Sequence, residues 1–558
     1  MLLDGGLTDS LTLSHGPATP MGHPFRLGLQ GRVHDGGDFV DAVGGLATVP
    51  RSDLPQSIQS LLGKTVGGYA ILNLILLRRR KFATRSDAPT EDERLSVQLF
   101  AGHYPREESV FALAQSVIRW RMDEQQTKKQ KYRWMLILLL FVASGEFIVR
   151  GPVRFLKGDS FNDFVSPYIQ SRAWMGNMDP YSPATLVRLW PRDATQFIFL
   201  KEDLADGDLV LKRGIPTAYP LTTYVLVSPF AALPWHLARV LWIFVSLAAF
   251  AAAVLSLSSL LGFRWPDTRT FCFLAFALAL APFHTGLAAG SIVIVAVGVS
   301  AAAVLAANRG WDSASGILIC VASGLKPQIG LPILVFYLLR KRWRVAIIAA
   351  ALLTTLALVG ASVLMVHGTP WLDSYKSDNR MLFAKGSLGD YTEANPIRFS
   401  LINLQVLLYT FWPDRTGANF VSLVLVSIVG FVWLFLFLRC KWDSDSELLA
   451  LSALLVLSLL PVYHRLYDAT LLIFPLAWSL HRARHRGVLA TATAAVILVF
   501  LFPGGSMAEV LQKKHPALQE SWYWMHFAMP HQVWTLLLLC LLLLMAMKNS
   551  ARTVLPPH

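Results

Sequence analysis

Asp163 follows the first strongly apolar run of the chain, residues 134–149, and lies at the end of a short polar segment, residues 157–164. A carboxylate at the mouth of a membrane helix is hydrated enough to ionise and close enough to the bilayer to meet a lipid-borne substrate. It can then act as a general base that removes the proton of an attacking hydroxyl. The alternative is a helix N-cap on the segment Phe164–Met175, because Asp is a preferred cap residue. Neighbouring residues that compete for the role of base are Asp159, Asn162 and Asp179.

Lys326 lies well inside an apolar run and is followed by Pro327 and Gln328. Proline lacks an N–H and kinks a helix, which frees backbone carbonyls toward a cavity. A buried ammonium needs an anionic partner, and a phosphate on a lipid-linked substrate is one. The alternative is a structural ion pair with an intramembrane carboxylate. Because the predicted spans contain few carboxylates, we favour the phosphate.

The segment Tyr463–Asp468 offers a cation, an imidazole and a carboxylate at the junction of two apolar runs. Arg465 is suited to a bidentate phosphate contact. His464 could orient a sugar or phosphate oxygen, or tune Asp163. Snorkelling of the arginine and tyrosine side chains to the membrane interface is the competing interpretation. His284, beside a Pro and a Gly, is expected to be a hydrogen-bonded structural residue rather than a substrate ligand.

The elements that position these residues are helices in a membrane. The chain has 558 residues, of which 54% are hydrophobic and 15% charged. Apolar runs of roughly 17–25 residues recur along it, long enough to cross a bilayer core, and runs of this length are helices rather than barrel strands. The four cysteines lie in or at the end of apolar runs, so neither a disulfide framework nor a metal site is indicated.

The net charge of +14 does not indicate nucleic-acid binding, because the basic residues cluster in short loops, as the positive-inside rule requires. The basic loops are residues 128–133, 340–344, 439–441, 481–486 and 548–552. About twelve spans then place both termini in the cytoplasm. They are 134–151, 218–235, 238–261, 270–288, 291–307, 314–338, 345–366, 418–438, 447–463, 467–480, 488–503 and 532–548.

This topology puts three long loops outside, namely 152–217, 367–417 and 504–531. It also puts Arg264, Arg269 and Arg309 outside, which makes 262–310 the stretch that fits the charge rule least well. Long loops are often functional. The Trp522–Trp524 cluster in the third loop is expected to anchor the membrane interface. Residues 1–127 lack a sustained apolar period and are expected to form a poorly ordered cytoplasmic extension before a transmembrane domain, residues 128–552. Because Met122 begins a stretch typical of a membrane-protein start, residues 1–121 are alternatively an artefact of the assigned start site.

Five short motifs occur in the order found in glycosyltransferase family 87, over about residues 130–550. Asp163-Phe164, Tyr168 and Gly176–Tyr181 resemble the first-loop signature of that family. Tyr219-Pro220 and Pro229 resemble its Tyr-Pro-Pro segment, with Leu221 in place of the second proline. The other three resemblances are Gly290-Ser291, Lys326-Pro327-Gln328 and Tyr463-His464. Signatures of zinc proteases, P-loops and serine hydrolases are absent from the sequence.

The resemblance implies an all-α GT-C fold in which outer loops form the active site, and an inverting transfer without a metal or other cofactor. It implies that Asp163 is the general base, that Lys326 and Arg465 recognise the donor phosphate, and that His464 is a polar contact. Four further residues are expected to bind substrate: Tyr168, Tyr219, Gln328 and Asp468.

The expected function is therefore transfer of a hexose, mannose by family precedent, from a polyprenyl-phosphate donor to a lipid or glycan acceptor. The expected location is the outer face of a bacterial inner membrane. Two alternatives stay open: transfer of another sugar, such as a pentose or aminoarabinose, and transport of a lipid-linked saccharide.

Overall fold

A computed structural model describes residues 26–28, 96–98, 130, 133–157, 163–191, 194, 219–264, 267–483, 487–502 and 504–552. The chain divides into two compact units, Met1–Trp134 and Met135–His558. Within the predicted extension, residues 1–127, the structure describes strand β1 (Arg26–Gly28) and strand β2 (Ser96–Gln98), which pair antiparallel with Leu27 opposite Val97. The rest of that extension lies outside the described residues.

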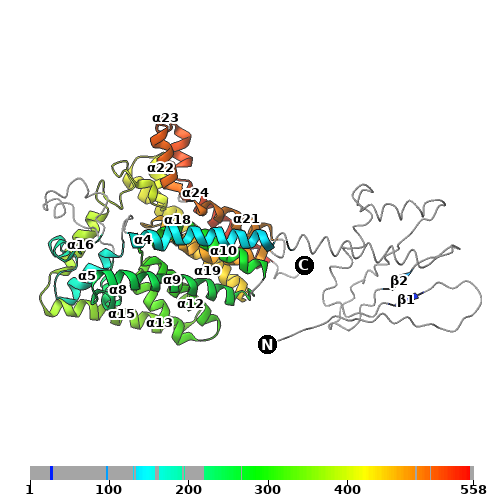
Figure 1. Cartoon of the computed structure of the whole chain (residues 1–558), viewed down its shortest axis with the longest axis horizontal. Coiled ribbons are helices and arrows are strands. Elements are labelled where there is room, and N and C mark those ends of the chain that lie inside the picture. Colours follow the sequence, from blue (N-terminus) through cyan, green and yellow to red (C-terminus); the bar gives the residue numbers. More distant parts are fainter. Residues whose placement is uncertain are drawn as a thin grey trace, which may run out of the picture. The chain divides into compact units, whose positions relative to one another are not determined.

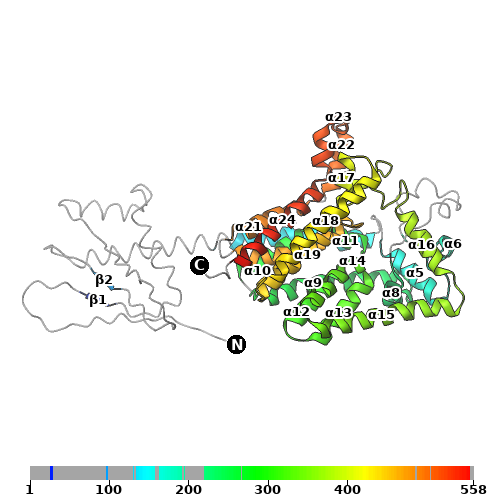
Figure 2. The ribbon, with the colours of Figure 1, turned by 180° about the vertical axis from the view of Figure 1, so that it is seen from behind.

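The second unit is helical, as the sequence predicts, and its long helices pack lengthwise against one another (Figures 1 and 2). Its first elements are η3 (Val149–Val153), α4 (Arg154–Lys157), α5 (Val165–Met175), α6 (Pro183–Leu189), α8 (Leu221–Ala231), α9 (Trp235–Leu260), α10 (Thr268–Ala279), α11 (Ala281–Ala289) and α12 (Val293–Asn308). Next come α13 (Asp312–Leu325), α14 (Pro327–Leu339), α15 (Trp343–Val366), α16 (Trp371–Leu382), η5 (Arg398–Ser400), α17 (Leu404–Phe411) and α18 (Arg415–Leu438). The last are α19 (Ser444–Ser458), η6 (Leu466–Leu472), α20 (Ile473–Ala483), α21 (Val488–Ile497), η7 (Leu498–Leu501), α22 (Gly504–Lys514), α23 (Ala517–Glu520), η8 (Trp524–Ala528) and α24 (His531–Arg552).

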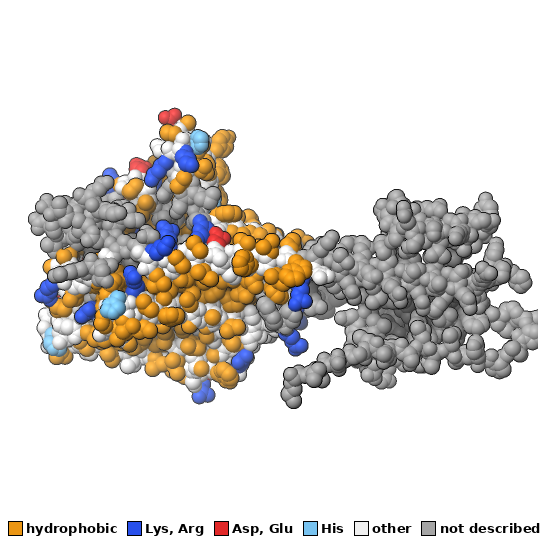
Figure 3. Space-filling model, viewed as in Figure 1, with side chains coloured by type: hydrophobic (Ala, Val, Ile, Leu, Met, Phe, Trp, Pro, Cys, Tyr) orange, Lys and Arg blue, Asp and Glu red, His pale blue; other side chains and the backbone are white. Residues whose placement is uncertain are grey.

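Five helices in the described part of the chain are long and apolar enough to cross a membrane: Arg133–Lys157, α9, α15, α18 and His531–Ser550. A sixth span results if α10 and α11, which meet at a bend of 46°, are counted together. Large apolar side chains on these helices, such as Phe431 and Leu438, are exposed, and the face in Figure 3 is mostly hydrophobic. Such a surface needs lipid around it.

The predicted span 314–338 is a pair of helices rather than one. Lys326 takes an extended conformation (φ −147°, ψ 99°), as a residue before proline prefers, and this ends α13 and begins α14. The two helices fold back on each other and approach closely at Gly330. A Cβ on that residue would lie 2.3 Å from the backbone nitrogen of Ser323. An ion pair of 3.3 Å between Asp312 and Arg342 joins the far ends of this hairpin. The hairpin therefore presents Lys326 at its tip.

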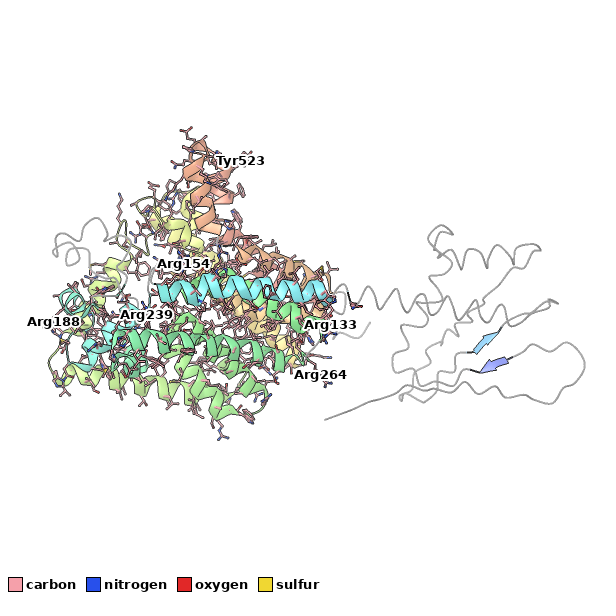
Figure 4. All side chains as sticks on the ribbon, viewed as in Figure 1. Arg133, Arg154, Arg188, Arg239, Arg264 and Tyr523 are labelled. Carbon is pink, nitrogen blue, oxygen red and sulfur yellow. The ribbon has the colours of Figure 1, made fainter. Side chains whose placement is uncertain are left out.

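The basic loops gather at one end of the helical unit, which we call the basic end. The contacts that connect them are Arg309 with Ser259 (2.8 Å), Asn308 with Ser444 (3.1 Å), Arg340 with Glu447 (3.4 Å), Arg482 with Asp445 (2.9 Å) and the ring of Phe263 with that of His481 (6.1 Å). Figure 4 shows Arg264 at this end and Arg188 at the opposite end.

The expectation that Arg264, Arg269 and Arg309 lie on the other side from the basic loops was therefore wrong. The cause is α8, which spans only Leu221–Ala231 and is too short to cross a membrane. Counting the predicted span 218–235 as a crossing inverted the side of every residue from 262 to 310. With α8 excluded, the positive-inside rule holds better than the sequence suggested.

Stacked aromatic rings hold α5 against α9 at the opposite end of the unit. The ring of Phe164 stacks on that of Trp242, with centroids 4.4 Å apart, and Tyr168 packs edge-on against Trp235 at 5.1 Å. Phe164 and Tyr168 are fully buried. Aromatic pairs of this kind stabilise a packed core beyond the contribution of their buried area. They therefore hold the backbone of Asp163, the residue before Phe164, in a fixed position.

Candidate active site

Asp163 is held by the turn between α11 and α12. Its backbone N–H donates to the carbonyl of Ala289 at 2.6 Å. Gly290, which caps α11, has φ +65°, and a Cβ there would lie 2.4 Å from the ring of Phe155. Trp242 donates from Nε1 to the carbonyl of Gly290 at 2.8 Å. Only glycine fits this turn, and the turn fixes the position of the Asp163 backbone.

The carboxylate of Asp163 does not cap a helix. The N-cap of α5 is Phe164, and no side chain caps that helix. Asp163 instead accepts a hydrogen bond from the hydroxyl of Tyr219, at 3.4 Å. The residue is half-buried, so a ligand can reach it. The helix-cap alternative is therefore wrong, and the carboxylate is available for chemistry.

The environment of Asp163 raises its pKa. Burial is the largest cause, and the positive charges of Lys326 and Arg465 and the hydroxyl of Ser291 oppose it. Burial also raises the pKa of Tyr219 well above its usual range, so that this phenol stays a neutral donor. A carboxylate with a raised pKa is a stronger base than an exposed one.

Lys326 makes the ion pair that the sequence offered as its alternative role. Its Nζ lies 2.5 Å from Oδ1 of Asp468, and both side chains are almost fully buried. The ammonium also lies 5.2 Å from the centre of the Tyr467 ring. Carboxylates seemed scarce in the spans because Asp468 was assigned to an outer junction. An ammonium has three N–H donors, and the ion pair with Asp468 uses one of them. Binding of a phosphate by the other two stays a prediction.

Asp468 binds three groups and is itself fully buried. Besides Lys326 it accepts hydrogen bonds from Nδ1 of His464 and from the backbone N–H of Arg465, both at 3.0 Å to Oδ2. It lies in the first turn of η6, where it closes the turn that begins at Arg465. Asp468 therefore organises the segment, and direct contact with a substrate stays a prediction.

His464 is also fully buried. Its Nδ1 faces Asp468, and its Nε2 lies 3.1 Å from the carbonyl oxygen of Ser458. Both ring nitrogens are thus occupied by acceptors of the protein. This geometry leaves neither ring nitrogen facing a ligand, and contact between His464 and a substrate stays a prediction.

Arg465 has a free donor in the site. Its Nε donates to the hydroxyl of Tyr463 at 2.7 Å, while its Nη2 is buried and has no hydrogen-bond partner among the described residues. Its backbone forms a β-bridge with Leu401, which attaches it to the second outer loop. A buried guanidinium nitrogen without an acceptor is costly, and an anionic ligand would satisfy it.

Two predicted ligands lie apart from this cluster. Tyr168 donates to the carbonyl of Leu233 at 2.8 Å and accepts from Arg172 at 3.0 Å, so it belongs to the aromatic core. Gln328 is half-buried in the first turn of α14, and its side chain makes no hydrogen bond within the described part of the chain. His284 is buried in α11 with Nε2 unpaired among the described residues.

Sequence reasoning missed Thr222 and Thr223 at the start of α8. Both hydroxyls donate to the carbonyl of Gly324 at 2.9 Å, and that of Thr223 also reaches the carbonyl of Leu325 at 3.0 Å. These carbonyls are left unsatisfied where α13 breaks before Lys326. The signal was present, because two adjacent threonines follow Tyr219-Pro220 in an otherwise apolar segment. They connect the helix that carries Tyr219 to the hairpin that carries Lys326.

Comparison with known families agrees with this arrangement. Residues 217–462 match the sequence model of glycosyltransferase family 87. The match supports the predicted family. Its range includes Tyr219 and Lys326 and ends just before His464, so Asp163 and Arg465 lie outside it. No curated protein and no solved structure matches the chain.

The match to family 87 indicates that the chain is a glycosyltransferase, and its long apolar helices indicate an integral membrane protein. A carboxylate and buried cations, as described above, are groups that can assist sugar transfer to a hydroxyl.

Proposed function

We propose that this membrane glycosyltransferase transfers a hexose, mannose by family precedent, from a polyprenyl-phosphate donor to a hydroxyl of a lipid or glycan acceptor. The observation that carries the proposal is the meeting of Asp163, Lys326 and Arg465 in one site. The charges of both cations act on the carboxylate. These residues come from three distant segments of the chain, so local structure alone does not require them to converge.

Asp163 serves the acceptor. It accepts the proton of the attacking hydroxyl while the oxygen forms a bond to the anomeric carbon of the donor sugar. Tyr219, 3.4 Å from the carboxylate, orients it and stays neutral. Attack from the side opposite the phosphate inverts the anomeric centre. The raised pKa of Asp163 makes its carboxylate a stronger base than that of an exposed aspartate.

Arg465 and Lys326 serve the donor. As the bond between the anomeric carbon and the phosphate oxygen breaks, negative charge grows on the polyprenyl phosphate. The unpaired Nη2 of Arg465 and the two remaining donors of Lys326 can stabilise that charge in a site largely closed to water. In this scheme the site residues supply both the base and the charge stabilisation.

The distribution of charge supports an outer active site. Basic loops prefer the cytoplasm, and they gather at the basic end of the unit. Arg188, in the helix α6 that follows α5, lies at the opposite end (Figure 4). We infer that Asp163 faces the extracytoplasmic side of a bacterial inner membrane and that both termini of the transmembrane domain are cytoplasmic.

One observation favours the competing function, transport of a lipid-linked saccharide. Broken helices with buried charges are typical of transporters, and the hairpin of α13 and α14 carries Lys326 paired with Asp468. The family match favours the enzyme.

The experiment that separates the two functions uses the full chain in lipid vesicles. A panel of radiolabelled polyprenyl-phosphate sugars is supplied with acceptor lipid extract, and both label transfer and movement of the labelled lipid across the bilayer are measured. The proposal expects transfer from one donor without protein-dependent translocation. Translocation without transfer would overturn it.

A further inference from the structure

The two ring nitrogens of His464 both face oxygen atoms that can only accept hydrogen bonds. Nδ1 lies 3.0 Å from Oδ2 of Asp468, and Nε2 lies 3.1 Å from the carbonyl oxygen of Ser458. The ring is fully buried, so water does not replace either contact. A neutral imidazole carries one N–H and would point a lone pair at one of these oxygens.

Protonation of Asp468 would offer another solution, since a carboxylic acid can donate to Nδ1. The other partners of Asp468 exclude it. Oδ1 accepts from the ammonium of Lys326 at 2.5 Å, and Oδ2 also accepts from the backbone N–H of Arg465 at 3.0 Å. Three donors around one buried carboxylate stabilise its ionised form. The geometry is satisfied when Asp468 is charged and His464 carries protons on both nitrogens.

We propose that His464 is a buried imidazolium that positions the donor site by balancing the charge of Asp468. This inference rests on the proposed function for its purpose, though not for its geometry. Two cations, Lys326 and His464, share one carboxylate, so the three side chains leave one net positive charge. Without the charge of His464, Asp468 would neutralise Lys326 completely. With it, Lys326 keeps its attraction for the phosphate of the donor lipid.

His464 is therefore a positioning residue and not a catalytic one. Its neighbours in sequence, Tyr463 and Arg465, are less buried; Arg465 keeps an unpaired Nη2 within the described part of the chain, and the Tyr463 hydroxyl accepts from its Nε at 2.7 Å. Asp163 is a further charged group near the cluster, since Lys326, Arg465 and Asp468 all act on it.

Nitrogen-15 NMR of the histidine rings tests the charge state directly. The full-length protein is labelled at histidine, reconstituted in lipid and measured near neutral pH, and the His464 signals are those absent from His464→Gln. The proposal expects two protonated ring nitrogens of imidazolium type. One protonated and one bare nitrogen would overturn it. Because this readout needs no activity, it stands even if the transferase function fails.

A double-variant cycle tests the purpose. His464→Gln leaves Lys326 and Asp468 as a neutral pair, and we expect the KM for the donor lipid to rise about 10-fold. Combining it with Asp468→Asn restores one net positive charge, so the KM should return most of the way to wild type. A packing role for His464 would instead give losses that add. Failure of rescue in folded protein would overturn the proposal, and if the double variant does not fold the NMR result decides.

Discussion

Replacing Asp468 by alanine should destabilise the protein more than replacing its partner Lys326 by methionine. Asp468→Ala leaves two buried cations, Lys326 and His464, without their shared carboxylate. Lys326→Met leaves Asp468 with two of its three donors, and the methionine refills the space of the lysine stem. Removing one partner of a buried pair costs about 3–5 kcal/mol, so we expect Asp468→Ala at or above that range and Lys326→Met below it.

The assay uses the four free cysteines, Cys272, Cys320, Cys440 and Cys540, as reporters of unfolding. Three of them are buried, so a fluorogenic maleimide labels them as the protein opens on heating in detergent. Asp373→Ala is the matched control, because the Asp373 carboxylate is 88% exposed and lies 3.6 Å from Lys376. An exposed pair contributes at most about 1 kcal/mol. Equal apparent melting temperatures for Asp468→Ala and the control would refute the reasoning.

Three further substitutions probe the groups around the site. Tyr219→Phe removes a donor that stabilises the ionised base, so the acid limb of the pH profile of kcat/KM should move to higher pH; an unchanged limb would exclude the contact. Thr223→Val leaves the buried carbonyl of Leu325 without its threonine donor, although Thr222 still donates to Gly324, and should cost about 1–3 kcal/mol in the maleimide assay, whereas Thr355→Val, on an exposed helix face, should cost little. Gly290→Ala meets both a positive φ and a ring 2.4 Å away, while Gly262→Ala meets a positive φ alone; the first should melt lower and lose activity, and equal melting would contradict the packing described for that turn.

The sequence predicted well those features that depend on local composition. Apolar runs predicted the helices, and Lys326-Pro327 predicted a kink at the position where α13 ends and α14 begins, because proline acts on its immediate neighbours. The basic loops were recognised too. The family match over residues 217–462 supports the resemblance drawn from short motifs, three of which lie within that range.

The features that the sequence did not predict depend on contacts between distant residues. Hydropathy cannot distinguish one long helix from two that fold back at Lys326, and the fold-back is enabled by Gly330 meeting Ser323. The ion pair of Lys326 joins it to a residue 142 positions away, and the composition of the spans gave no sign of it. Because α8 was counted as a crossing, the sides of the neighbouring loops were inverted.

Burial changed the interpretation of two predicted ligands. His464 and Asp468 have residue types that bind sugars and phosphates, but their polar atoms are occupied inside the protein. Residue type alone cannot show whether a polar atom faces a ligand or a neighbouring side chain. Asp163 and Arg465 differ in this respect, because one is half-buried and the other retains an unpaired donor.

The central claim is that Asp163 is the general base of a sugar transfer. Its most direct test is the rate of label transfer by Asp163→Asn, with Asp373→Asn as the control at an exposed carboxylate. Loss of a positioned base should lower kcat by about 10²–10⁴-fold. Because burial raises the pKa of Asp163, its ionised form destabilises the fold, and the variant should melt at or above the wild-type temperature. A folded Asp163→Asn protein that transfers sugar at the wild-type rate would contradict the account.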